Sequence, residues 1–307
     1  MSSQAWLFPG QGAQAPGMGR DLAESTPESA ALFDRANEVL GMDLRRIIFD
    51  GPAEELTRSD RAQPAIFLVS AAFAYALRAR RPALAWAAAA GHSLGEWTAL
   101  YAAGVIGFDD ALRVLRDRGT FMQEACAQNP GAMLAVIGLD AARLEEISAQ
   151  SGAEIANFNA PDQTVLSGTS EAITNAERMA GEQGAKRAIR LQVAGAFHST
   201  LMKPAAEQLR KTLEGVTFHP PKFPVYSNVT GRPHGGPDDI RKAMVAQVTH
   251  SVRWVDTIGA MRAAGVGRFV ECGPGKVLSG LVKRIDRAAE MHTIGDLASL
   301  QAAQDAL

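Results

Sequence analysis

The amino-acid sequence predicts an α/β fold in which a smaller antiparallel unit is inserted into a larger α/β unit. Short apolar runs alternate with longer helical patterns along most of the chain, as they do in successive strand–helix units. From Gly131 onward the order becomes strand, helix, strand, strand, helix, strand, which is the ferredoxin-like arrangement. The length of 307 residues allows one large domain with such an insertion, or two domains.

The first part of the chain is expected to hold strands at 5–8 and 84–90 and helices at 27–40, 65–80, 94–103 and 109–127. The run 84–90 fits a strand or a helix by periodicity alone, but Gly91 and the periodic segment after it favour strand, turn and helix. Pro64 precedes the second helix, and Asp109 is placed as the N-cap of the last one.

The inserted unit is predicted to run from 129 to 195. Its strands are expected at 132–137, 153–157, 163–168 and 185–193, and its helices at 141–151 and 171–183. After it we expect helices at 201–213 and 237–248, unassigned segments at 223–228 and 254–264, a strand at 268–271 and a last helix near Val277. The larger unit therefore comprises 1–128 and 196–307.

Charge and cysteine content exclude several classes of protein. With 31 Lys and Arg against 33 Asp and Glu, the chain lacks the basic excess of a general nucleic-acid or polybasic membrane binder. The longest apolar stretch, 65–77, is too short to cross a bilayer, and no basic segment precedes the N-terminal apolar run, so we expect no membrane span or secretion signal. Cys126 and Cys272 are isolated, which argues against disulfides and metal sites and fits a cytoplasmic protein.

The strongest chemical signal is the sequence Gly-His-Ser-Leu-Gly at 91–95. This G-x-S-x-G pattern, between a predicted strand and a predicted helix, is typical of a nucleophile elbow. Small residues allow the tight turn that exposes the Ser93 hydroxyl, and the helix N-terminus behind it can offer N–H groups to an oxyanion. The alternative is an ordinary Gly-rich turn without a catalytic role.

A serine nucleophile needs a base, and His198 is the best placed of the six histidines. It lies at the junction between the inserted unit and the following helix, where a cleft is expected. His92 adjoins Ser93, but neighbouring side chains diverge at an elbow. The other four lie in polar connections or near the C-terminus: His219, His234, His250 and His292. A hydrogen-bonded structural histidine is the alternative for His198.

A second Gly-rich turn, at 9–19, invites a nucleotide-binding interpretation. The spacing of Gly12 and Gly17 matches a P-loop, but Met18 and Gly19 stand where Lys and Ser or Thr are required, so that type of phosphate binding is excluded. The dinucleotide-binding pattern is only weakened, because Ala15 can replace its third glycine. A hydrogen-bond donor near the serine is a better use of this turn.

Six ordered motifs together resemble one known family. They are FPGQGAQ at 8–14, GHSLGE at 91–96, RGTFMQ from 118, NFNAPDQTVLSG at 157–168, GAFHSTLMKPA at 195–205 and GPGKVLSGL at 273–281. Their sequence and order are similar to those of the malonyl-CoA:acyl-carrier-protein transacylases, acyltransferases of fatty acid and polyketide synthesis. The resemblance implies an α/β-hydrolase-like large subdomain with an inserted ferredoxin-like small subdomain.

The resemblance also implies roles for residues of these motifs. Ser93 would be acylated with His198 as its general base. Gln11 and the Leu94 N–H match the oxyanion-hole positions. The backbone carbonyl of Gln247 would orient the imidazole.

Substrate choice falls on a further set of positions. Arg118 matches the residue that binds the free carboxylate of malonyl, and a planar guanidinium can donate two parallel hydrogen bonds to such a group. Without the resemblance, Arg118 would be interpreted as a solvated helix residue. Phe197 would crowd a methyl branch, which favours malonyl over methylmalonyl. The other substrate-binding positions are Met122, Asn159 and Val277.

The implied reaction transfers malonyl from malonyl-CoA, through the serine, to the phosphopantetheine thiol of an acyl carrier protein. It needs no cofactor, metal, nucleic acid or membrane, and a monomer is expected. An acidic carrier would dock on Lys186, Arg187 and Arg190, although the same charges could protect an edge strand. The alternatives are a serine esterase or thioesterase, an acyltransferase for acetyl or methylmalonyl groups, and a catalytically silent scaffold.

Overall fold

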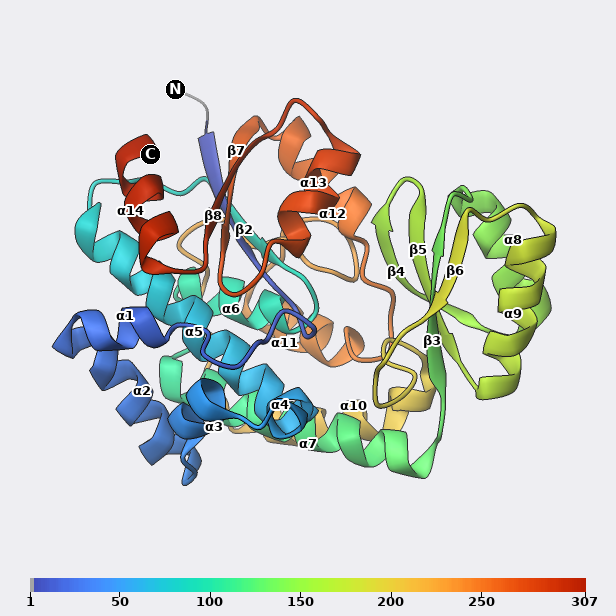
Figure 1. Ribbon diagram of the computed structural model, residues 1–307, viewed down its shortest axis with the longest axis horizontal. Coiled ribbons are helices and arrows are strands. Elements are labelled where there is room, and N and C mark those ends of the chain that lie inside the picture. Colours follow the sequence, from blue (N-terminus) through green and yellow to red (C-terminus); the bar gives the residue numbers. More distant parts are fainter. Residues whose placement is uncertain (1–2) are drawn as a thin grey trace.

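The computed structural model describes residues 3–307 and contains two units, each built on one β-sheet (Figure 1). The sheet of the larger unit has the strand order β2-β1-β7-β8, and all of its neighbouring pairs are parallel. Its strands are β1 (Ser3–Phe8), β2 (Ala88–Gly91), β7 (Val266–Cys272) and β8 (Glu290–Ile294). Parallel strands joined by helices confirm the predicted α/β class.

Helices cover both faces of this parallel sheet. Trp6 and Phe8 of β1 pack in the core formed with α5, α6 and α7, whereas Ala5 and Leu7 point to the other face, towards α12 and α13. The helices of the larger unit are α1 (Arg20–Ser25), α2 (Pro27–Leu40), α3 (Leu44–Asp50), α4 (Ala53–Thr57), α5 (Ser59–Arg80), α6 (Leu94–Ala102), α7 (Phe108–Gln128), the 3₁₀ turn η1 (Thr200–Met202), α10 (Lys203–Glu214), α11 (Pro237–Ala246), α12 (Trp254–Ala263), α13 (Val277–Ile285) and α14 (Leu297–Ala306).

The long helix α5, most of whose residues are buried, belongs to the core of the larger unit. It is long and apolar enough to cross a membrane, but 83% of its most hydrophobic window is buried inside the fold. The expected start at 65 is wrong, because the helix begins at Ser59 and contains Pro64. Pro64 lacks the N–H of one helical bond near the N-terminal end. The helix continues through Pro64 because α7 packs along it and most of its residues are buried in the core.

The smaller unit is an antiparallel sheet of order β4-β5-β3-β6 with two helices on one face. Its elements are β3 (Ala132–Ile137), α8 (Ala141–Ser151), β4 (Glu154–Ala160), β5 (Gln163–Gly168), α9 (Ser170–Glu182) and β6 (Arg187–Arg190). Leu134 and Val136 of β3 pack beneath the helices, whereas Met133 and Ala135 belong to the core of the larger unit. The order of strands and helices is the predicted one, and the sheet presents its second face to the larger unit.

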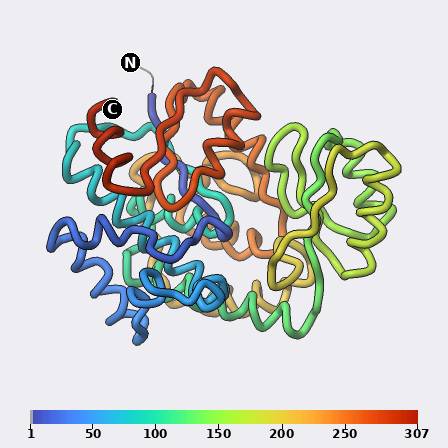
Figure 2. The backbone as a smooth tube through the Cα atoms, viewed as in Figure 1, coloured from blue at the N-terminus to red at the C-terminus, as the bar shows by residue number. Residues whose placement is uncertain are grey.

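The smaller unit is joined to the larger one by two chain crossings and by contacts along β4. Figure 2 shows the chain passing from α7 into the smaller unit and returning to η1 and α10. A parallel bridge joins Asn157 of β4 to Val252, and Val252 donates its N–H to the Ala156 carbonyl oxygen at 2.8 Å. At the far end of β4, Arg284 of α13 forms an ion pair with Asp162.

The start of α7 differs from the prediction. The helix begins at Phe108 with Gly107 as its N-cap, so Asp109 is not the capping residue. Asp109 lies in the first turn, and its carboxylate binds Arg35 of α2. An acidic residue in the first turn still complements the helix dipole.

The end of the chain was also predicted incompletely. The helix that opens at Val277 is not the last, since β8 and α14 follow it. β8 is a short edge strand with charged and polar residues, so it lacks the apolar alternation that marks a buried strand. β6 ends at Arg190 rather than at 193, because the chain leaves the sheet there.

We expect Gly119→Ala to destabilise the crossing of α5 and α7. A Cβ at Gly119 would lie 2.3 Å from the Ser59 carbonyl oxygen and 2.8 Å from the Asp60 Cα, so the two backbones must separate. The free energy of unfolding should fall by about 1–3 kcal/mol, as in other overpacked sites. The measurement is the midpoint of urea unfolding.

The matched control is Gly259→Ala in α12, where a Cβ would meet nothing within 4 Å. This exchange should leave stability unchanged or raise it by up to about 1 kcal/mol, since alanine favours a helix. Equal midpoints for Gly119→Ala and the wild type would show that the close crossing is unimportant.

Candidate active site

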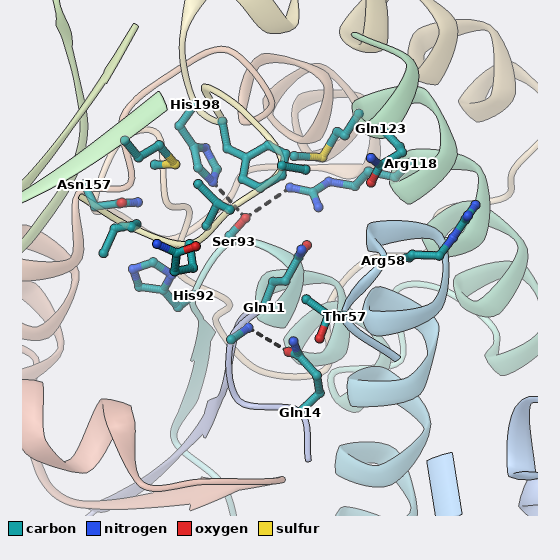
Figure 3. A pocket seen from close by; sticks show the side chains of 18 of the residues that line it. Gln11, Gln14, Thr57, Arg58, His92, Ser93, Arg118, Gln123, Asn157 and His198 are labelled. Carbon is teal, nitrogen blue, oxygen red and sulfur yellow. Dashed lines mark hydrogen bonds between the residues drawn. The ribbon is translucent and has the colours of Figure 1, made fainter. Parts of the chain in front are cut away.

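Ser93 lies in a tight turn between β2 and α6. Its φ of 52° lies in the left-handed region, which is unusual for a residue other than glycine. A Cβ at Gly91 would lie 2.0 Å from the carbonyl carbon of Gly95, and one at Gly95 would lie 2.1 Å from the Phe8 carbonyl oxygen. The two glycines therefore permit the turn, which directs the Ser93 hydroxyl into a cavity (Figure 3).

Asn228, which no motif singled out, holds this turn from behind. Its Oδ1 accepts the Ser93 N–H at 2.7 Å, and its Nδ2 donates to the Gly91 carbonyl oxygen at 2.7 Å. Asn228 is fully buried and lies in a segment without regular structure. Only the fold brings it to the serine.

His198 is the partner of the serine. Its Nε2 lies 2.8 Å from the Ser93 Oγ, and its Nδ1 lies 2.9 Å from the Gln247 carbonyl oxygen and 3.1 Å from that of His250. Carbonyl oxygens accept only, so the proton sits on Nδ1 and the Nε2 lone pair faces the serine hydroxyl. Burial, with the positive charge of Arg118, lowers the pKa of His198 to about 3. The imidazole is therefore a neutral base at neutral pH.

Backbone strain marks the same two residues. Ser93 and His198 are the non-glycine residues with a positive φ in the part of the chain that the structure describes. Each such conformation costs about 1–3 kcal/mol and persists only where its surroundings enforce it. In these conformations the side chains of Ser93 and His198 face each other across a 2.8 Å contact.

Arg118 of α7 brings a positive charge to the serine. The residue is 1% exposed, and its Nη2 donates to the Ser93 Oγ at 3.1 Å. Nη1 donates to Gln63 Oε1 at 2.6 Å, and Nη2 also donates to Gln247 Oε1 at 3.0 Å. Burial lowers the pKa of Arg118 to about 10, so the group stays charged at neutral pH. Its Nε–H has no acceptor within residues 3–307.

The predicted oxyanion-hole positions lie beside the serine. Leu94 is the first residue of α6, where backbone N–H groups have no acceptor within the helix. Gln11 lines the same cavity, and its side chain donates to the Ser59 Oγ at 3.2 Å. The Gln11 side chain is thus anchored away from the serine, which leaves backbone N–H groups as the donors that could face an oxyanion.

The cavity has a volume of about 450 Å³ and lies between the two units. Six of the predicted site residues line it: Gln11, Ser93, Arg118, Met122, Phe197 and His198. The smaller unit contributes uncharged residues to the wall, namely Met133, Asn157, Leu191, Gln192, Val193 and Ala194. No group of three His, Cys, Asp or Glu side chains could hold a metal ion among the described residues.

Two predicted substrate-binding positions lie outside this lining. The Asn159 Oδ1 faces the Nε2 of His92 at 2.9 Å, and His92 lies on the cavity side of this contact. Asn157, which lies on β4 with Asn159, lines the cavity instead. Val277 is 56% exposed, because α13 turns Leu278 and Leu281 towards the core and Val277 away from it.

Of the predicted docking residues, Arg187 and Arg190 lie on β6, an edge strand of the smaller sheet, and Lys186 directly precedes it. Lys186 and Arg187 are exposed, whereas Arg190 forms an ion pair with Glu177 of α9 at 2.8 Å. None of the three lines the cavity, but the segment that follows them, 191–194, does. Lys186 and Arg187 form no ion pair with another residue of 3–307, and both precede the segment that reaches the cavity.

The arrangement unites a serine nucleophile, a neutral imidazole base and an unneutralised cation. The first two can form a covalent ester by attack on a carbonyl carbon. The cation adds a preference for an acyl group that carries negative charge.

Comparison with known proteins places the chain among acyl transferases. The family model described as an acyl transferase domain matches residues 5–306. The malonyl CoA-acyl carrier protein transacylases of Bacillus subtilis and Escherichia coli are each 42% identical over 99% of this chain, and the match covers 96% and 99% of those proteins.

Solved structures agree with these relatives. An acyl carrier protein S-malonyltransferase from Vibrio cholerae superposes with a TM-score of 0.95 at 41% identity, covering 98% of this chain and 100% of the other. A malonyl-transacylase solved in complex with a type II PKS acyl-carrier protein superposes with a TM-score of 0.96 at 40% identity, covering 100% of both chains.

The low pKa of His198 predicts a flat pH dependence for modification of Ser93 by an uncharged sulfonyl fluoride. Reaction needs the neutral imidazole, and a folded-state pKa of about 3 keeps it neutral far below the ordinary value of 6.5. The labelling rate should therefore stay constant between about pH 5 and 8. His198→Ala sets the background rate. A rate that halves near pH 6.5 would contradict the buried, neutral base.

Proposed function

The chain belongs to the acyl transferase family, and from that membership we propose that it transfers malonyl from malonyl-CoA to the phosphopantetheine thiol of an acyl carrier protein. The relatives described above carry the name of this activity, and one was solved with an acyl-carrier protein bound. The observation that carries the proposal is the buried guanidinium of Arg118, 3.1 Å from the Ser93 hydroxyl oxygen.

A buried cation beside the nucleophile favours an acyl group with its own negative charge. Malonyl carries a carboxylate next to the carbon that bears the thioester, whereas acetyl does not. The guanidinium has five N–H donors. Neutral oxygens of Gln63, Gln247 and Ser93 accept three of them. The buried Nε–H has no acceptor among residues 3–307, so the guanidinium keeps a charged donor for the carboxylate of a malonyl group.

The first half-reaction acylates the serine. The Ser93 Oγ attacks the thioester carbonyl carbon while its proton passes to His198 Nε2, which lies 2.8 Å away. The carbonyl π electrons move onto oxygen, and the backbone N–H groups at Leu94 and Gln11 stabilise the resulting oxyanion. When the oxyanion collapses, the C–S bond breaks, CoA leaves with the proton from His198, and malonyl remains esterified to Ser93.

The second half-reaction repeats these steps in reverse with a new thiol. His198 takes the proton of the carrier's phosphopantetheine thiol, and the sulfur attacks the ester carbonyl carbon. The bond to the Ser93 Oγ then breaks and the serine recovers its proton from the imidazole. Both half-reactions exchange one acyl group between O and S atoms, so the proposed chemistry requires no cofactor or metal.

The choice among acyl groups rests on Phe197, whose ring is 8% exposed and lines the cavity next to the base. A methyl branch on the malonyl group would have to displace part of this ring, so methylmalonyl is disfavoured.

The proposal includes a monomeric enzyme that acts in the cytoplasm, where CoA thioesters and carrier proteins meet. Sedimentation of the purified chain tests the monomer.

A serine esterase or thioesterase is the second candidate function, because it would use the same elbow and base with water as the acceptor. It has no use for an unneutralised Arg118 beside the serine. A catalytically silent scaffold would need neither the strained Ser93 nor the neutral His198.

The test is the intact mass of the protein after exposure to malonyl-CoA or acetyl-CoA. The wild type should gain one malonyl group, and Ser93→Ala should gain none, while Ser167→Ala, a change at a buried serine of β5, should react normally. A stable adduct on Ser93→Ala would overturn the mechanism. No adduct on the wild type would favour the scaffold, and an adduct that water removes quickly without carrier would favour the esterase.

Arg118→Ala should separate the two acyl donors in the same assay. Loss of two charge-assisted hydrogen bonds should lower malonylation by about 100-fold or more, while acetylation is kept. Arg116→Ala, which removes a half-exposed arginine of α7 paired with Asp117, is the matched control. An unchanged malonyl preference in Arg118→Ala would refute the carboxylate contact.

Carrier docking is proposed at Lys186 and Arg187, with Arg190 beside them engaged by Glu177. Reversing both free charges to Glu should raise the KM for the carrier about tenfold, because an acidic partner is then repelled, and should leave acylation by malonyl-CoA unchanged. The control reverses Arg143 and Arg178 on α8 and α9, the helical face of the smaller unit. Equal loss in both half-reactions would contradict docking.

A further inference from the structure

A fully buried carboxylate lies behind the active site. Glu96 of α6 is 0% exposed and does not line the cavity. Its Oε1 lies 2.6 Å from the Nε2 of His234, whose side chain is 2% exposed. Its Oε2 accepts from the Gln247 Nε2 at 2.6 Å and from the Asn228 N–H at 3.1 Å. One carboxylate thus receives three hydrogen bonds from groups that are distant in sequence.

Gln247 lies between this carboxylate and the site. Its Nε2 donates to Glu96 and to the Ser93 carbonyl oxygen, the latter at 2.9 Å, while its Oε1 accepts from Arg118. An anion on one side and a cation on the other permit only one orientation of the carboxamide. The backbone oxygen of the same residue accepts from His198 Nδ1. Gln247 therefore contacts both the base and the cation.

Asn228, another partner of Glu96, contacts the turn that carries the nucleophile. Asn228, whose backbone N–H binds Glu96, uses its side chain to accept the Ser93 N–H and to hold the Gly91 carbonyl oxygen. Ser93, His198 and Arg118 are thus each one residue removed from Glu96. Such a location is costly for a carboxylate, because burial removes the water that would solvate it.

We propose that Glu96 and His234 are positioning residues for acyl transfer, acting through Gln247 on Arg118 and His198. The inference rests on the proposed function, because it concerns the geometry of that reaction. Glu96 fixes the Gln247 carboxamide so that its oxygen faces the guanidinium, and His234 fixes the carboxylate. Without this pair the carboxamide can turn its N–H₂ towards Arg118, where two donors repel and the guanidinium loses its alignment.

The first test compares malonyl-CoA and acetyl-CoA as donors to Glu96→Gln. A glutamine in this place has one accepting oxygen for three donors, so the hydrogen bonds to His234, Asn228 and Gln247 cannot all form. Ser93 acylation should slow with both donors, and the malonyl-to-acetyl rate ratio should fall about tenfold, the effect of one lost charged hydrogen bond. A purely structural role would lower stability without changing the ratio.

Glu271→Gln is the matched control, because Glu271 is equally buried and also accepts three hydrogen bonds, from Leu278 and Ser279 at the start of α13. This variant should lose thermal stability and keep the wild-type ratio. If Glu96→Gln also keeps the ratio, the inference is overturned. Failure of the wild type to be malonylated would instead overturn the proposed function.

Variants of His234 decide the matter if Glu96→Gln does not fold. His234→Gln keeps an N–H that can reach Glu96 and should retain a ratio close to that of the wild type. His234→Leu lacks a donor, frees the carboxylate to move, and should show the lowered ratio. Wild-type ratios in both His234 variants would overturn the inference.

Discussion

The structure depends on keeping the charge of one buried guanidinium available. Arg118 is 1% exposed, and its direct partners are the neutral oxygens of Gln63, Gln247 and Ser93. Neutral acceptors offset part of the desolvation cost but do not cancel the charge, as a carboxylate in direct contact would. The nearest compensating anion, Glu96, acts from behind Gln247. The cation is thereby stable enough to bury and still able to attract an anionic substrate.

The same constraint accounts for the partner of the base. In many serine enzymes a carboxylate orients the histidine, but here two backbone carbonyl oxygens, of Gln247 and His250, face Nδ1 of His198. A carboxylate at that point would stabilise an imidazolium and would also lie near the guanidinium, whose charge it would reduce. Carbonyl oxygens fix the tautomer without adding a charge, and Arg118 in turn helps to keep the imidazole neutral.

The sequence predicted the parts of the site that depend on local patterns. The glycines around Ser93 and the junction position of His198 are visible as motifs, and the α/β class follows from alternating runs. Arg118 could be assigned only through the family resemblance, since its burial arises where α5 crosses α7 at Gly119. The folded chain alone brings together Glu96, Asn228 and His234, so their spacing in the sequence does not predict these contacts. Pro64 concealed the start of α5, and the polar edge strand β8 lacks the pattern of a core strand.

The two units divide the cavity in a way that separates shape from charge. Every ionisable residue of its lining, Glu54, Arg58, His92, Arg118 and His198, comes from the larger unit, and the wall of the smaller unit is uncharged. Natural variation or engineering could therefore change the residues that the smaller unit contributes to the cavity wall, and so alter which acyl chains and carriers fit. The electrostatic machinery would be inherited intact, because its contacts run through α6, α7 and the segment around Gln247.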